Sequence, residues 1–180
     1  MKATGIVRRI EDLGRIVIPK EIRRTLRIRE GDPLEIFTEK DGEVIFKKYS
    51  PVGELSQFVS VYAEIINKST GITAVITDKD SVIAAAGSHK RELLEKKLSH
   101  EAEHMVSQRT PYVYRLGEKR VEVVSGEEKL HVGICSKIIV DGDIAGSIIL
   151  LIDDMGAIPS ETDVKLISTT SQLLARQLEA

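Results

Sequence analysis

Residues 4–28, TGIVRRIEDLGRIVIPKEIRRTLRI, decide the fold of the first part of the chain. Two runs rich in β-branched residues, 4–10 and 15–18, flank a short turn that contains a glycine, and this pattern predicts a hairpin. Pro19 suits the first position of a helix because its φ is fixed near the helical value, and good helix formers follow it. We therefore expect two strands and then a helix of about two to three turns over residues 20–28.

A second hairpin is predicted after that helix. A Gly-Asp-Pro sequence at residues 31–33 ends the helix. Residues 34–40 and 43–49 then flank Asp41 and Gly42, and Asp-Gly between two such runs is a strong signal for a tight turn. The predicted order of elements is strand, strand, helix, strand, strand.

The positive charge of the chain is concentrated at its beginning. Residues 1–30 hold nine Lys and Arg against four Asp and Glu, although the whole chain of 180 residues has a net charge of −2. Residues 1–48 carry +3 and residues 49–180 carry −5. A basic segment on an acidic protein favours a polyanionic partner, above all nucleic acid. The charge also indicates the domain organisation: a domain at residues 1–50, a linker at 51–55 and a second domain at 56–180.

The helix over residues 20–28 separates its apolar and basic side chains. Ile22 and Leu26 lie about 40° apart around the helix axis, whereas the arginines occupy a different arc. One interpretation is that the arginines only form the solvated face of a small helix. Further arginines on the preceding hairpin favour a shared basic surface instead.

The first domain is too short to bury an adequate core by itself. It has no cysteine for a disulfide or a zinc site, so association with a second chain is the remaining source of stability. A symmetric dimer would duplicate the basic surface across a two-fold axis, and such a surface suits duplex DNA.

The sequence TGIVRRIEDLGRIVIPKEIRRTLRI, followed by GDPLEIF and DGEVIFKKY, resembles the AbrB-type DNA-binding domain of bacterial transition-state regulators. The resemblance runs to residue 49 without a gap. It implies a swapped-hairpin fold, in which two chains interleave their hairpins in one β-barrel. It also implies that the homodimer binds double-stranded DNA through Arg8, Arg9, Arg15, Arg23 and Arg24, with Lys2 as a weaker candidate.

The rest of the chain reads as a separate folded domain. The spacing of apolar residues from Leu55 to Ile66 predicts an amphipathic helix, and Ser160 is placed to cap a closing helix of about five turns. One or two short helices are expected within residues 90–108. Strands are predicted at residues 72–77, 81–86, 110–116, 121–124, 130–140 and 144–152, of which the last two form a hairpin around Asp-Gly-Asp.

This order of elements resembles the GAF small-molecule sensor domain. The whole chain is therefore expected to be an α+β protein, with an AbrB-like barrel followed by a GAF-like antiparallel sheet and flanking helices. The combination resembles transcription regulators of spore-forming bacteria, which implies activation and repression of sporulation genes. It also implies assembly into a dimer or tetramer, partly through the helices that bracket the GAF-like domain.

No catalytic residue and no cofactor or metal site is assigned. The single cysteine, Cys135, is interpreted as a buried structural thiol, which also fits a reducing cytosol. His100 and His104 have the i,i+4 spacing of a metal pair, and HEAEH superficially resembles a zincin motif. A surface helix is the alternative that we prefer, and we expect the protein not to be an enzyme.

Two questions remain open from the sequence. A ligand pocket is expected between the sheet and residues 87–115, but a GAF-like domain used only for assembly is the alternative. The second question is whether the chain is an antitoxin-like interaction protein, since MazE-type antitoxins share the first domain. The folded second domain favours a regulator. No signal-peptide or membrane-spanning run is seen, so we expect a cytoplasmic, nucleoid-associated protein.

Overall fold

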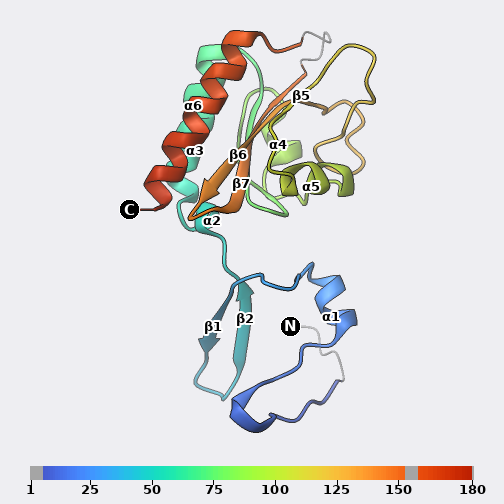
Figure 1. Cartoon of the computed structure of the whole chain (residues 1–180), viewed down its shortest axis with the longest axis vertical. Helices are drawn as coiled ribbons and strands as arrows, with labels where there is room; N and C mark the ends of the chain where they lie inside the picture. Colours follow the sequence, from blue (N-terminus) through green and yellow to red (C-terminus); the bar gives the residue numbers. More distant parts are fainter. Residues whose placement is uncertain (1–5, 153–157, 180) are drawn as a thin grey trace. The chain divides into compact units, whose positions relative to one another are not determined.

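The computed structural model describes residues 6–152 and 158–179 (Figure 1). The chain forms two compact units, Met1–Tyr49 and Ser50–Ala180. Each unit has its own sheet: a two-stranded sheet in the first and a five-stranded sheet in the second. The two units are described separately below.

The second hairpin of the first unit forms as predicted. Strands β1 (Leu34–Thr38) and β2 (Val44–Lys48) pair antiparallel, with Leu34 opposite Lys48 and Thr38 opposite Val44. Gly42 lies in the turn with a φ of 81°, a conformation that glycine adopts without a steric cost. The Asp-Gly signal therefore placed the turn correctly.

Helix α1 (Lys20–Thr25) is shorter than predicted. Arg27 has a φ of 55°, and the amide of Ile28 donates to the carbonyl of Arg23 over 2.7 Å. A left-handed residue followed by such a backward hydrogen bond ends a helix in the manner of a Schellman motif. Pro19 precedes the helix as its N-cap residue instead of occupying the first turn.

Within residues 6–19, the flanks of the first predicted turn form no strands, so the prediction of a hairpin was wrong for the described part of one chain. The only regular element between residues 6 and 19 is the short 3-10 segment η1 (Asp12–Gly14). The amide of Glu11 donates to the carbonyl of Arg15 over 2.8 Å, so the turn is present although its flanks form no strand. A strand needs a neighbouring strand for its hydrogen bonds, and the described part of one chain provides none here.

The second unit has a sheet between two helical layers (Figure 1). Its strand order is β4-β3-β7-β6-β5, with every neighbouring pair antiparallel. Helices α3 and α6 cover one face, and α4 and α5 cover the other. The elements are α2 (Pro51–Glu54), α3 (Ser56–Thr70), β3 (Ala74–Thr77), β4 (Val82–Ala86), α4 (Lys90–Leu93), α5 (His100–Ser107), β5 (Tyr112–Val113), β6 (Val132–Val140), β7 (Asp143–Leu151) and α6 (Glu161–Leu178).

Alternating side chains of the sheet divide the core between these layers. Ile134, Ile148 and Leu150 pack with the apolar faces of α3 and α6. Cys135 and Ile149, one residue further along their strands, pack with α4 and α5 on the opposite face. This alternation is what a sheet covered on both faces requires. Cys135 is fully buried, so the interpretation of a buried thiol is confirmed.

Several boundaries differ from the sequence predictions. Residues 110–116 contribute only the two-residue strand β5, and residues 121–124 make isolated bridges instead of a strand. The region 90–108 holds two short helices, α4 and α5. Residues 51–55, expected to be a linker, begin the second unit: α2 buries Val52 in the core shared with α3 and α6.

The closing helix forms as predicted. Ser160 accepts from the amide of Asp163, and the carboxylate of Asp163 accepts from the amide of Ser160 over 2.8 Å. This reciprocal capping box satisfies amides that the first helical turn leaves without partners. Within residues 6–152 and 158–179, no helix combines the length and apolar character needed to cross a membrane.

Candidate nucleic-acid interface and C-terminal pocket

The five arginines predicted to contact DNA lie on two segments of the first unit. Arg8, Arg9 and Arg15 flank η1, and Arg23 and Arg24 lie on α1. Four of these side chains are exposed, and Arg23 is half-buried. Lys2, the sixth predicted contact, lies outside the described residues.

These five guanidinium groups form no ion pairs with the residues that the structure describes. Among residues 6–152 and 158–179, none of the five pairs with a carboxylate. Lys48 of the same unit behaves differently: its ammonium lies 3.3 Å from the carboxylate of Asp32 and donates to the carbonyl of Arg27 over 2.9 Å. Lys48 therefore joins β2 to the end of α1, whereas the five arginines can meet an external anion.

The first unit also leaves most of its apolar side chains uncovered. From residue 6 to residue 49, Pro19 is the only buried residue that the structure describes. Burial of apolar side chains is the main source of stability in a folded domain, and this unit has little of it in one chain. Its large exposed apolar side chains are Ile6, Val7, Ile10, Leu13, Ile16, Val17, Leu26, Ile36, Phe37, Val44, Phe46 and Tyr49.

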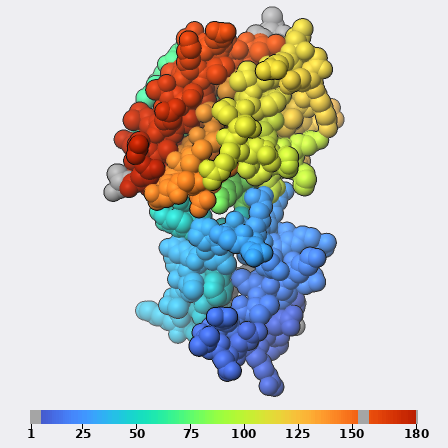
Figure 2. All heavy atoms as spheres, in the orientation of Figure 1, coloured from blue at the N-terminus to red at the C-terminus, as the bar shows by residue number. Residues whose placement is uncertain are grey.

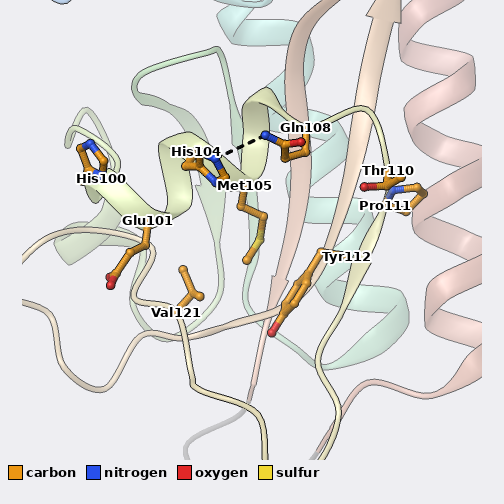
Figure 3. Close-up of a pocket in the computed structure, with 9 residues that line it drawn as sticks. All are labelled: His100, Glu101, His104, Met105, Gln108, Thr110, Pro111, Tyr112 and Val121. Carbon is orange, nitrogen blue, oxygen red and sulfur yellow. Dashed lines mark hydrogen bonds between the residues drawn. The ribbon is translucent and has the colours of Figure 1, made fainter.

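The second unit contains a pocket of about 410 Å³ between α5 and the segment 110–121 (Figure 3). Side chains of Met105, Tyr112 and Val121 point toward a common space in its centre. The pocket lies beside the sheet and partly within residues 87–115. Its lining consists of His100, Glu101, His104, Met105, Gln108, Thr110, Pro111, Tyr112 and Val121.

Two titratable groups in the wall of this pocket, those of Glu101 and Tyr112, have shifted pKa values. The ammonium of Lys119 lies 2.6 Å from the carboxylate of Glu101, and its hydrogen bond and charge lower the pKa of Glu101. The same contact raises the pKa of Lys119. Burial raises the pKa of Tyr112, with a smaller contribution from the charge of Glu118. At neutral pH, the pocket wall therefore contains the carboxylate of Glu101, which is paired with Lys119, and an un-ionised phenol.

His100 and His104 do not converge on a common point. The Nε2 atom of His104 lies 3.4 Å from the side-chain nitrogen of Gln108, while His100 points elsewhere from α5 (Figure 3). Among the described residues, no three His, Cys, Asp or Glu side chains are grouped as a metal site would need. Both histidines instead lie on the pocket wall, a placement that their i,i+4 spacing did not distinguish from a surface helix.

A second uncovered apolar surface lies on the helices α3 and α6. Phe58 and Ile65 belong to the periodic pattern that predicted α3, but their side chains are 40% and 56% exposed. Val61 and Leu173 add further exposed apolar surface. Tyr62 connects the two helices through a 3.3 Å hydrogen bond from its hydroxyl to Gln177. Figure 2 shows α6 lying along the surface of its unit.

Sequence comparison relates the two units to two families. Residues 54–179 match the family described as stage V sporulation protein T C-terminal, transcription factor. Residues 7–53 match the family described as antidote-toxin recognition MazE, bacterial antitoxin. Stage V sporulation protein T of Bacillus subtilis (strain 168) is 47% identical over 180 residues, which cover 99% of both chains.

Other relatives resemble one unit only. The transition state regulatory protein AbrB of the same organism is 59% identical over 51 residues, or 28% of this chain and 52% of AbrB. The GAF domain of PixJ from Thermosynechococcus elongatus is similar in structure, with a TM-score of 0.57 and 9% identity, over 72% of this chain and 87% of that domain. At this low identity the likeness concerns the fold alone. The AbrB-like and GAF-like fold assignments are thus confirmed.

Proposed function

The chain belongs to the stage V sporulation protein T family of transcription factors, and from this membership we propose that it activates and represses sporulation genes by binding duplex DNA. The observation that carries the proposal is the group of five arginines on the first unit, none of them paired with a carboxylate of the described chain. Guanidinium groups bind phosphate and guanine edges with two hydrogen bonds and stay charged at any relevant pH.

The DNA contacts that we propose are Arg8, Arg9, Arg15, Arg23 and Arg24, with Lys2 in a weaker role. Arg23 and Arg24 come from α1, while the other arginines flank η1. Contacts from two segments would bring positive charge to more than one phosphate group of the DNA. The unit has few exposed aromatic rings for stacking on unpaired bases, which favours duplex over single-stranded DNA.

We propose that the first unit works as an interleaved homodimer. Its apolar side chains are exposed in one chain, and residues 15–18 form no strand there although their composition favours one. A second copy could supply both the missing neighbouring strands and the missing core. The DNA surface would then be a two-fold-symmetric property of the dimer.

The second unit is proposed to sense a small molecule, to assemble dimers into tetramers, or both. The exposed apolar side chains on α3 and α6 support the assembly role, because an apolar surface exposed to water favours self-association. The pocket beside α5 supports the sensing role. Neither role needs catalysis, and we place the protein in the cytoplasm, on the nucleoid.

An antitoxin-like role is the less supported alternative. The match to the MazE family covers residues 7–53, whereas the transcription-factor family accounts for residues 54–179. Relatives that share only the first unit therefore explain less of the chain.

Binding of AT-rich duplex DNA, measured by fluorescence anisotropy, tests the proposal. Arg23→Ala and Arg24→Ala should each weaken binding by about 1 to 3 kcal/mol or lower its salt dependence. If the lost contacts are to phosphate, a dimer loses two of them per substitution, and the slope of log K against log salt should fall by about 2. Arg91→Ala, which removes an exposed cation from the second unit, is the matched control. Unchanged affinity and slope in both α1 variants would exclude this arginine surface.

A further inference from the structure

The pocket beside α5 has a lining that restricts what it can bind. Its volume of about 410 Å³ lies near the lower end of the range for small-molecule sites, roughly 300 to 1,000 Å³. A ligand of one or two rings would fit in it. Met105, Pro111, Tyr112 and Val121 give the pocket an apolar centre, and the three of them that point into the centre leave a space suited to an aromatic or aliphatic body (Figure 3).

The lining is poor in net charge. Of the described residues that line it, none is Lys or Arg, and its single carboxylate, that of Glu101, already pairs with Lys119 at 2.6 Å. Of the described lining residues, only His100 and His104 can carry a positive charge, so a phosphate or a nucleotide would meet no permanent cation. Met105, Tyr112 and Val121 are half-buried, and a charged group placed among them without a partner would lose part of its hydration, which disfavours charged ligands.

One side of the pocket nevertheless offers hydrogen bonds. His104 and Gln108 lie there with their side-chain nitrogens 3.4 Å apart, and the hydroxyl of Thr110 is on the same side of the pocket (Figure 3). The amide and the hydroxyl can each donate and accept. This edge suits one neutral polar group, such as an amide or a hydroxyl.

We propose that this pocket binds a small uncharged molecule with an apolar, ring-sized body and one amide- or hydroxyl-like group. The inference deepens the proposed sensing role of the second unit and rests on it. Because the described lining has no lysine or arginine, the inference excludes nucleotides and phosphorylated metabolites as the ligand. It also assigns His104 and Gln108 as the residues that orient the polar group.

Methyl NMR of the full chain can test the proposal with defined probes. The chain has three methionines, Met1, Met105 and Met155, so selective labelling of their methyl groups gives few signals, and Met105→Leu assigns the one in the pocket. Benzamide should shift the Met105 signal saturably, with a dissociation constant of about 1 to 10 mM for a ligand of this size. Benzoate has nearly the same shape but a charge, and should bind at least about tenfold more weakly.

Two variants locate the site. Val121→Phe fills the centre and should weaken benzamide binding at least fivefold. Gln108→Ala removes part of the polar edge from an exposed position, so folding is not at risk, and should weaken binding about threefold or more. Ser107→Ala, exposed on α5 but outside the lining, should have no effect.

Equal or tighter binding of benzoate would overturn the assignment of an uncharged ligand. Absence of a saturable Met105 shift with benzamide would overturn the site itself. Both readouts are made without DNA, and the anisotropy assay on the same preparation reports DNA binding. Failure of this inference is therefore distinguishable from failure of the proposed regulatory function.

Discussion

The ammonium of Lys137 on β6 donates a hydrogen bond to the carbonyl oxygen of Met105, 2.8 Å away in the last turn of α5. Lys137 is only 7% exposed, and its ammonium also contacts the sulfur of Cys135 at 2.9 Å. The preceding residue, Ser136, faces the other side of the sheet and bonds to Ser171 of α6 over 2.7 Å. Two adjacent residues of β6 thus contact different layers: Lys137 bonds to α5 beside the pocket, and Ser136 bonds to α6 on the opposite face of the sheet.

Replacing Lys137 should loosen the attachment of α5. Lys137→Ala removes a buried donor and the packing of its methylene groups, and we expect unfolding to become easier by about 1 to 3 kcal/mol. Lys137→Met keeps most of the packing and removes the cost of burying a charge, so it should be less destabilising. Urea unfolding of both variants measures the difference. Greater destabilisation by Met than by Ala would contradict this account.

A glycine at position 146 is required by the contact between β7 and β3. A Cβ atom on Gly146 would collide with the carbonyl oxygen of Thr77, which is backbone and cannot turn aside. Gly146→Ala should therefore reduce the unfolding free energy by about 3 kcal/mol.

Gly117→Ala is a suitable control for this substitution. Gly117 has a φ of 92° but no atom within 4 Å of a Cβ position, so its substitution introduces backbone strain without a collision. Its cost should be about 1 kcal/mol. Thermal unfolding of both variants would show a steric effect only if Gly146→Ala is clearly the worse.

The apolar surface on α3 and α6 should control assembly. Ile65→Glu places a charge on this surface, where the native side chain is 56% exposed. If the surface joins dimers, the variant should stay dimeric at concentrations at which the parent is a tetramer, because burying an unpaired carboxylate is costly. Light scattering coupled to size exclusion measures the mass.

Ser107→Glu makes the same change of charge on α5, across the sheet from α3. It should leave the mass unchanged. A parent protein that is dimeric at all concentrations tested, or an Ile65→Glu variant that remains tetrameric, would count against assembly through this surface.

Local patterns in the sequence predicted the elements that one chain can complete. The Asp-Gly turn predicted the β1–β2 hairpin, and Ser160 predicted the capped start of α6. Each of these features depends on neighbours within a few residues. The strand prediction for residues 15–18 was also based on local composition, but a strand requires a partner that the described part of a single chain does not supply.

The site features were less accessible to sequence reasoning. The periodicity of α3 placed Phe58 and Ile65 on the apolar side of the predicted helix. Periodicity alone does not say how much of that side the same chain buries. Lys137 occurs in a largely apolar predicted strand, and only the structure shows that its ammonium reaches the end of α5. The arginines of the first unit were predicted as DNA contacts from two signals that agreed, their charge and the family resemblance.

Tyr112 should make the protein more sensitive to alkaline pH. Burial raises the pKa of its phenol above the ordinary value of 10.0, with a further contribution from Glu118, so the folded chain retains the proton more firmly than the unfolded chain. This contribution to stability is complete below the unfolded pKa and is lost as the pH rises through the folded one. Tyr112→Phe should therefore flatten the decline of the unfolding free energy between about pH 9 and pH 11. Tyr62→Phe, which removes an exposed hydroxyl between α3 and α6, is the control, and an equal flattening in both variants would show that Tyr112 has no special role.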